Sequence, residues 1–189
     1  MKGSRYSTVA IVLHWLIALG IIVNIGLAWI WPLLSEDALA PLLTTHKSIG
    51  ITILGLAIMR VLWRWGHRPP ALPSSYGHRE RTASYAVHFL LYSALFVMPI
   101  SGWVIDSAWK EAASHPMHYF FLAEWPRLGF VMTLPPTTKL WLFNAATATH
   151  AYFAYILYGA FILHVAGALK HQWFDREREL QRMWFARKG

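Results

Sequence analysis

Residues 140–169 read LWLFNAATATHAYFAYILYGAFILHVAGAL and contain no Lys, Arg, Asp or Glu. A helix of about 20 apolar residues spans the hydrocarbon core of a bilayer, so this stretch predicts a transmembrane helix. Charge-free runs of comparable length cover residues 6–35 and 82–105. Three spanning helices therefore follow from the distribution of charge alone.

A fourth span is predicted over about residues 45–65, with Lys47 near one end and Arg60 near the other. Long basic side chains at such positions extend their charged groups to the membrane surface. With four spans, both chain ends lie on one side, and of the 17 Lys and Arg residues only four fall on the other: Lys47, Lys110, Arg127 and Lys139. Because basic residues accumulate on the cytoplasmic side, both termini are expected in the cytoplasm.

The expected fold class is therefore all-α, an integral membrane four-helix bundle. Residues 1–172 are expected to form one domain, in which the aromatic-rich segment 106–139 folds back as a cap over the outer helix ends. Residues 173–189 form a basic, aromatic tail typical of a segment that lies on an anionic leaflet. The predicted spans are 8–31, 45–65, 84–105 and 141–169.

The composition supports a membrane location and excludes cofactors that need cysteine. Only 14% of the residues are charged, against about 25% in soluble proteins. The net charge of +8 is accounted for by orientation in the membrane, so we infer no nucleic-acid partner. The chain has no cysteine, which excludes thioether-linked haem, thiolate-bound iron–sulfur clusters and disulfides.

Four histidines lie at matched depths in the predicted spans. His150 and His164 are 14 residues apart, close to four helical turns, so they share one helix face with a rise of about 21 Å. His14 lies near the inner end of the first span and His46 near the outer end of the second. Depth therefore pairs His14 with His164, and His46 with His150.

Such pairs suit haem iron, because two neutral imidazoles occupy both axial positions and leave none for oxygen or substrate. A small residue follows each histidine by four positions, which would let a porphyrin lie against the helix: Ala18, Gly50, Ala154 and Ala168. Each histidine taken alone is equally compatible with a hydrogen bond between packed helices. The prediction of two haem b groups rests on the four together.

Two further residues lie at the depth of the inner pair. Arg60 follows His46 by 14 residues, so its guanidinium can pair with haem propionates or end the span at the membrane surface. His88 is compatible with an alternative ligand, a proton-transferring group beside a quinone or a helix-packing residue, and the last is the commonest role.

The outer segments carry weaker signals. His115 and His118 are three residues apart, but two histidines alone are more often not a metal site. Four outer cations are compatible with an electropositive entrance for an anion and, more commonly, with solvated loop charges: Lys47, Lys110, Arg127 and Lys139.

Together these motifs resemble the prokaryotic cytochrome b561 family over nearly the whole chain. The resemblance is carried by HW at 14–15, HKSIG at 46–50, RVLWR at 60–64, PP at 69–70 and HVAGALKH at 164–171. It implies two bis-histidine b haems with ligands at His14, His46, His150 and His164, ubiquinone as an electron partner, and the bacterial inner membrane. The long outer segment with its Ser114-His115-Pro116 turn departs from the shortest members, which leaves the outer substrate open.

Three functions follow as alternatives. A superoxide-oxidase-like activity implied by the resemblance would oxidise superoxide on the periplasmic side and reduce ubiquinone through the two haems. A membrane anchor would instead pass electrons between quinone and a separate redox protein. A non-redox transporter or scaffold would use the histidines for packing or proton movement.

Overall fold

The computed structural model describes residues 5–73 and 75–184, which form long helices joined by short connections. The elements are α1 (Thr8–Ile30), a 3-10 turn η1 (Trp31–Leu33), α2 (Glu36–Gly66), α3 (His78–Ala108), β1 (His118–Tyr119), β2 (Ala123–Glu124), α4 (Gly129–Met132), α5 (Pro136–Trp173) and α6 (Glu179–Arg182). Four of the described helices are long and apolar enough to cross a membrane: α1, α2, α3 and α5. The chain is an all-α membrane bundle, as the charge pattern predicts.

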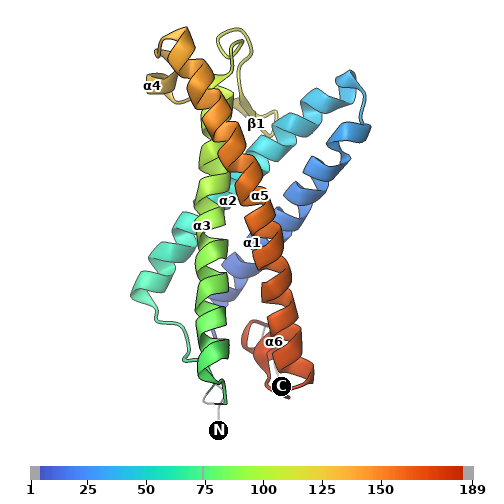
Figure 1. Ribbon diagram of the computed structural model, residues 1–189, viewed down its shortest axis with the longest axis vertical. Helices are drawn as coiled ribbons and strands as arrows, with labels where there is room; N and C mark the ends of the chain where they lie inside the picture. Colours follow the sequence, from blue (N-terminus) through green and yellow to red (C-terminus); the bar gives the residue numbers. More distant parts are fainter. Residues whose placement is uncertain (1–4, 74, 185–189) are drawn as a thin grey trace.

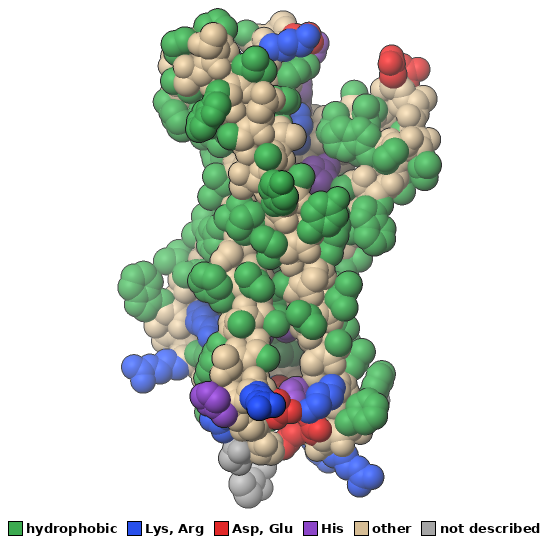
Figure 2. Space-filling view, viewed as in Figure 1, with side chains coloured by type: hydrophobic (Ala, Val, Ile, Leu, Met, Phe, Trp, Pro, Cys, Tyr) green, Lys and Arg blue, Asp and Glu red, His purple; other side chains and the backbone are tan. Residues whose placement is uncertain are grey.

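Helix α3 packs along α5, while α1 pairs with α2 and α2 also contacts α3. Figure 1 shows α1 beginning and α5 ending at the same end of the bundle, which we call the terminal end. The α1–α2 connection and the segment between α3 and α5 lie at the opposite end, called the cap end. Apolar side chains cover much of the visible surface between these ends (Figure 2), as expected for lipid-facing helices.

Local sequence signals define the helix ends. Ser7 caps α1, because its hydroxyl accepts a hydrogen bond of 3.3 Å from the Ala10 amide. Helix α2 begins at Glu36, nine residues before the predicted span starts, and it passes through Pro41. Proline lacks an amide donor and normally ends a helix, so the sequence pattern underestimated the length of α2.

Helices α3 and α5 also extend beyond the predicted spans, so the connection between them is residues 109–135. This segment folds back on the bundle. Its β1–β2 hairpin pairs Tyr119 with Ala123 and contacts α2. The Tyr119 hydroxyl lies 2.8 Å from Oγ1 of Thr52, and the Phe120 amide donates to Oγ of the buried Ser48 at 2.8 Å. The hairpin therefore covers α2 close to His46.

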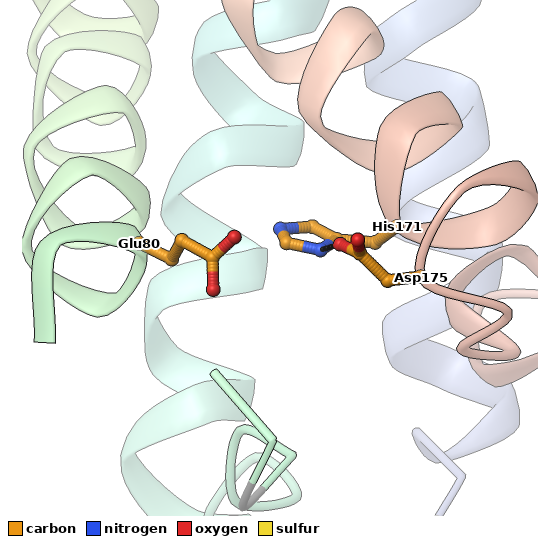
Figure 3. Close-up of side chains that lie close together, drawn as sticks. All are labelled: Glu80, His171 and Asp175. Atoms are coloured by element: carbon orange, nitrogen blue, oxygen red, sulfur yellow. Dashed lines mark hydrogen bonds and ion pairs between the residues drawn. The ribbon is translucent and has the colours of Figure 1, made fainter. Parts of the chain in front are cut away.

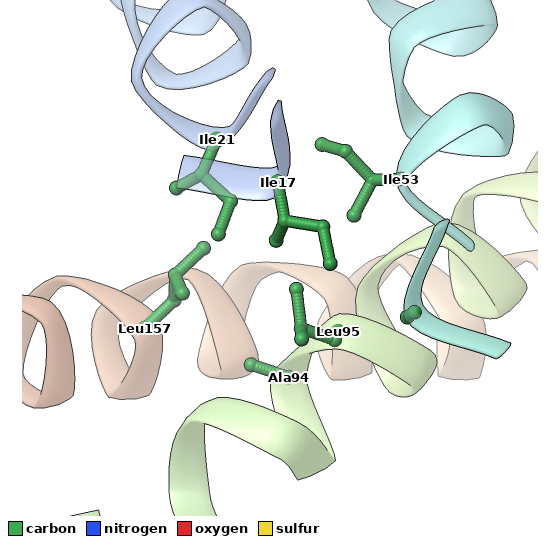
Figure 4. Close-up of a cluster of buried hydrophobic side chains, with 7 residues drawn as sticks. Ile17, Ile21, Ile53, Ala94, Leu95 and Leu157 are labelled. Atoms are coloured by element: carbon green, nitrogen blue, oxygen red, sulfur yellow. The ribbon is translucent and has the colours of Figure 1, made fainter. Parts of the chain in front are cut away.

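The core lies midway along the bundle. Figure 4 shows buried aliphatic side chains from all four long helices meeting there. The cluster consists of Ile17, Ile21, Ile53, Ala57, Ala94, Leu95 and Leu157. Leu157 is seven residues from both His150 and His164, so this apolar layer separates the two histidine depths along α5.

The tail after α5 returns to the bundle at the terminal end. The Trp15 indole donates a 2.7 Å hydrogen bond to the Met183 carbonyl, and the Arg5 guanidinium donates to the Gln181 and Trp184 carbonyls. Trp173 and Phe174 are exposed. Lys2 of the basic N-terminal end, and Phe185, Arg187 and Lys188 of the expected interfacial tail, lie outside the described residues.

Candidate functional site

At the cap end, His46 of α2 faces His150 of α5. Their ring centres are 6.3 Å apart and their planes are inclined by 59°. A metal–imidazole bond of about 2 Å, with about 1 Å from the ring nitrogen to the ring centre, puts two imidazoles on opposite sides of one ion about 6 Å apart. The cap-end pair has this spacing.

A hydrogen bond determines which nitrogen of His150 is protonated. Oγ of Ser101 on α3 donates to the Met98 carbonyl at 2.9 Å and lies 3.0 Å from Nδ1 of His150. A hydroxyl has one hydrogen, so a Ser101 that donates to Met98 must accept from His150. Nδ1 of His150 then carries the proton, and the lone pair on Nε2 is available to a metal.

His46 also fits a ligand, because its Nδ1 is buried and has no hydrogen-bond partner among the described residues. Both histidines line a mostly apolar cavity of about 240 Å³ between the helices. Five of its lining residues are glycine or alanine, which leaves room between the helices: Ala28, Gly50, Ala94, Gly102 and Ala154. A Cβ built on Gly102 would lie 3.5 Å from Cε1 of His150. A flat, largely apolar group matches these surroundings.

At the terminal end, His14 of α1 faces His164 of α5. The ring centres are 6.1 Å apart and the planes are inclined by 69°. The four histidines thus form two separate pairs, one at each depth, with α5 contributing to both. This is the arrangement that the 14-residue spacing predicts, although the role of these residues as iron ligands stays a prediction.

Arg60 turns into the bundle rather than extending to the membrane surface. Its Nη1 lies 3.0 Å from Nδ1 of His14, and its Nε donates to the Tyr92 hydroxyl at 3.1 Å. A guanidinium has no acceptor, so Nδ1 of His14 accepts in this arrangement. Arg60 therefore contacts the terminal-end pair directly.

His88 of α3 lies beside the same pair. Its ring centre is 5.2 Å from that of His164, and its Nδ1 is 3.3 Å from Oγ of Ser84. A third imidazole at this distance is compatible with a packing role, with an alternative ligand and with a proton-transferring group beside a quinone. The sequence pattern left these three roles open.

The four outer cations do not gather into one entrance. Lys47 and Arg127 both form ion pairs with Asp106, whose side chain is 3% exposed, and Nε of Arg127 lies 2.8 Å from it. Lys110 pairs with Glu111 at 3.5 Å, and Lys139 forms no ion pair within the described residues. Asp106 was not predicted as a site residue, although it directly follows a charge-free run and is the first carboxylate at the cap end of α3.

The two cap histidines have different neighbours. His115 lies against Trp109 and its Nδ1 is 3.1 Å from Oγ of Ser114, whereas His118 pairs with Glu124 in the hairpin. Among the described residues, one group has metal-ligand spacing: Glu80, His171 and Asp175. In Figure 3, Glu80 of α3 points toward His171 and Asp175.

A lysine already supplies the positive charge of this group. Nζ of Lys170 lies 2.5 Å from Glu80 and 2.7 Å from Asp175, and Nδ1 of His171 lies 2.6 Å from Asp175. The cluster is therefore an ion-pair network that joins α3, α5 and the tail. It was not predicted from sequence, since Glu80 and Asp175 are far apart in the chain.

Comparison with known proteins decides the family. The sequence pattern of the family described as prokaryotic cytochrome b561 matches residues 5–186. The chain belongs to this family. It is 33% identical over 183 residues to cytochrome b561 homolog 2 of Escherichia coli (strain K12), covering 95% of this chain and 90% of that protein. It is 24% identical over 191 residues to the probable superoxide oxidase CybB of Yersinia pestis, covering 98% of each.

As a cytochrome b561 family member, the chain is a bacterial membrane protein that binds b-type haem and transfers electrons. This excludes the alternative of a non-redox transporter or scaffold. Both ring spacings suit an iron. At the cap end, Ser101 also fixes a ligand tautomer and His46 has an unpartnered buried nitrogen, whereas His14 would have to release its hydrogen bond with Arg60 to bind iron through Nε2.

Proposed function

We propose that the chain binds two haem b groups, one between His14 and His164 and one between His46 and His150, and carries electrons between the two membrane surfaces. The observation that carries this proposal is the pair of ring separations, 6.1 Å and 6.3 Å, at two depths of one bundle. Haem ligated by two histidines supplies one-electron transfer and offers no open position to substrate. Substrates must therefore exchange electrons from outside the iron coordination sphere.

The residues around each pair have distinct tasks in this proposal. Oγ of Ser101 accepts a hydrogen bond from Nδ1–H of His150 and orients the ring toward His46. An iron ligand bound through Nε2 keeps its proton on Nδ1, so a ligating His14 cannot accept from Arg60. Arg60 then needs another acceptor, and a haem propionate is a suitable one because guanidinium pairs bidentately with carboxylate.

The orientation follows from the distribution of positive charge. The terminal end carries most of the Lys and Arg residues, and we assign it to the cytoplasm and the cap end to the periplasm of the bacterial inner membrane. The apolar layer around Leu157 lies between the two pairs and separates the two aqueous sides. Electrons cross this layer while ions and water are excluded.

We assign ubiquinone to the terminal end as electron acceptor and superoxide to the cap end as donor. The name of the Yersinia pestis relative, probable superoxide oxidase, supports the donor. Lys47 and Arg127 with Asp106 sum to one positive formal charge near His46, which attracts a small anion modestly and in a salt-dependent way. The reaction then balances as two superoxide anions oxidised to oxygen for each ubiquinone reduced to ubiquinol, with two protons taken up.

An anchor for a separate redox protein is the second candidate. The observation that favours it is the tip of the cap hairpin, where Phe121 and Leu122 are 61% and 84% exposed. An apolar tip at the periplasmic surface is compatible with a partner protein that delivers electrons. Such a chain would not turn over alone.

Turnover of the purified protein distinguishes the two. The haem-loaded chain in detergent is mixed with a soluble ubiquinone and supplied with superoxide, and ubiquinol formation is measured. We expect ubiquinol in a two-to-one ratio of superoxide to quinone, in excess of a control without protein. If the haems are redox-active with dithionite but inert to superoxide, the anchor function replaces the oxidase function.

A further inference from the structure

A second cavity, of about 530 Å³, opens at the terminal end beside the last turns of α2. Four arginines line it: Arg5, Arg60, Arg64 and Arg68. Its described lining residues include no Asp or Glu. Aromatic side chains complete the wall, including Trp63, whose indole donates to Oγ of Ser7 at 2.9 Å. The cavity is therefore strongly cationic, and the hydrogen bond between Trp63 and Ser7 holds α2 to the start of α1 in its wall.

None of these four arginines forms an ion pair with a residue that the structure describes, although Arg5 and Arg60 donate to neutral acceptors. Arg64 lies 5.8 Å from the ring centre of Tyr92. Two other cations at this end are paired, Lys170 with Glu80 and Arg182 with Glu179. The positive charge of the cavity is thus left for a ligand.

The sequence spacing concentrates this charge. Arg60 and Arg64 are four residues apart near the end of α2, so they lie on one helix face, and Arg68 follows just beyond Gly66. The planar guanidinium group presents donors that match the oxygens of phosphate. Several of them around one cavity therefore indicate a phosphate-bearing ligand.

The surroundings indicate a lipid. On the same turns of α2, Leu62 and Trp65 are 60% and 84% exposed, as expected for side chains that contact acyl chains and the membrane interface. The cavity lies beside the last turns of the membrane-spanning helix α2, where a basic cluster is expected to meet headgroup phosphates. Basic pockets between helices on the cytoplasmic side recognise anionic headgroups.

We propose that this cavity binds the phosphate of an anionic phospholipid, held by Arg64 and Arg68, with the acyl chains along the apolar face of α2. The proposal rests on the cytoplasmic orientation proposed above, but not on the two-haem assignment or the electron donor. The lipid site and the proposed oxidase activity can therefore fail independently.

Native mass spectrometry of the haem-loaded full chain in detergent tests this proposal. The delipidated protein is titrated with phosphatidylglycerol, with phosphatidylcholine and with soluble glycerol 3-phosphate. The test variant is Arg64→Gln/Arg68→Gln. The control is Arg79→Gln/Arg178→Gln, which removes the same charge from exposed positions at the same end. Folding is checked by elution volume and the haem spectrum.

We expect phosphatidylglycerol to bind the test variant about 25-fold more weakly than the wild type, about fivefold per arginine, and the control variant within about twofold. Phosphatidylcholine should bind without dependence on the variant, and glycerol 3-phosphate should not compete. If the double variant does not fold, Arg68→Gln alone, beyond the end of α2, should show about fivefold weaker binding.

Three results would overturn the proposal. Equal phosphatidylglycerol binding by test and control variants would remove the arginines from the site. Competition by glycerol 3-phosphate at the concentration of the lipid would make it a soluble-anion site. Loss of haem from a folded test variant, with lipid binding unchanged, would assign the arginines to the haem propionates.

Discussion

Oγ of Ser101 on α3 lies 3.0 Å from Nδ1 of His150 on α5, and the same hydroxyl donates to the Met98 carbonyl. This relationship gives α3 an influence on the cap-end pair, although in the proposed assignment α3 supplies none of the four ligands. The serine sets the tautomer of His150 and limits rotation of its ring. A partner of this kind normally tunes both affinity and electronic character of a metal ligand.

Ser101→Ala should therefore weaken binding of the cap-end haem by about 10- to 100-fold, because Nδ1 of His150 loses its acceptor. Haem titration of the apoprotein, followed by the visible spectrum, measures the change. Ser101→Thr keeps a hydroxyl and serves as the control. Unchanged affinity and midpoint potential in Ser101→Ala would show that this hydrogen bond does not support a ligand.

Replacing one ligand from each pair should separate the two sites. His164→Ala is expected to remove the terminal-end haem and leave most of the cap-end haem, and His150→Ala the reverse, because each haem needs both axial nitrogens. Haem content per chain and redox titration measure the outcome. Retention of both haems in either variant would remove that histidine from the ligand set, and loss of both in a folded variant would argue against independent sites.

The fold could be predicted from sequence where one local property decides it. The length of charge-free runs placed three helices, and the 14-residue interval on α5 placed His150 and His164 on one face. The expected depth of each histidine in the bilayer then paired His46 with His150 and His14 with His164, and the structure has these rings facing each other. These inferences need only helix geometry and the thickness of a bilayer.

The remaining features depend on contacts between distant residues. Asp106 binds Lys47 across 59 positions, and Ser101 reaches His150 across 49. The hairpin over α2 depends on Ser48 accepting from Phe120, whose backbone has a φ of 47°. A left-handed phenylalanine has little local preference, so only the tertiary contact explains it. Pro41 inside α2 is a similar case, where packing overrides a local signal.

Asp106→Asn should destabilise the cap end. The carboxylate is buried between Lys47 and Arg127, and its neutralisation leaves two cations that share no counter-charge. Removing one partner of a buried ion pair costs about 3 kcal/mol of unfolding free energy. Thermal unfolding in detergent measures this loss. Glu111→Gln, which breaks an exposed pair with Lys110, is the control and should change stability little.

The tail should loosen in acid. Its hydrogen bond from Lys170 holds the pKa of the Asp175 carboxyl below its usual range. A lowered pKa means that the contact stabilises the docked tail above pH about 4 and that this contribution is lost as the pH falls through the folded-state value. Hydrogen exchange over residues 173–182 should be faster in Asp175→Asn than in wild type at about pH 6, and the two rates should become equal once the pH is below the folded-state pKa of Asp175. A difference that persists in acid would contradict this account.

The haem content of the purified chain tests the central claim most directly. Detergent-purified, haem-supplemented protein is measured by its reduced-minus-oxidised spectrum and by a pyridine haemochrome assay against protein concentration. The two facing histidine pairs predict two haem b per chain, both with the spectrum of low-spin bis-histidine iron. One haem per chain, or none in a folded preparation, would contradict the assignment of His14, His46, His150 and His164 as two iron sites.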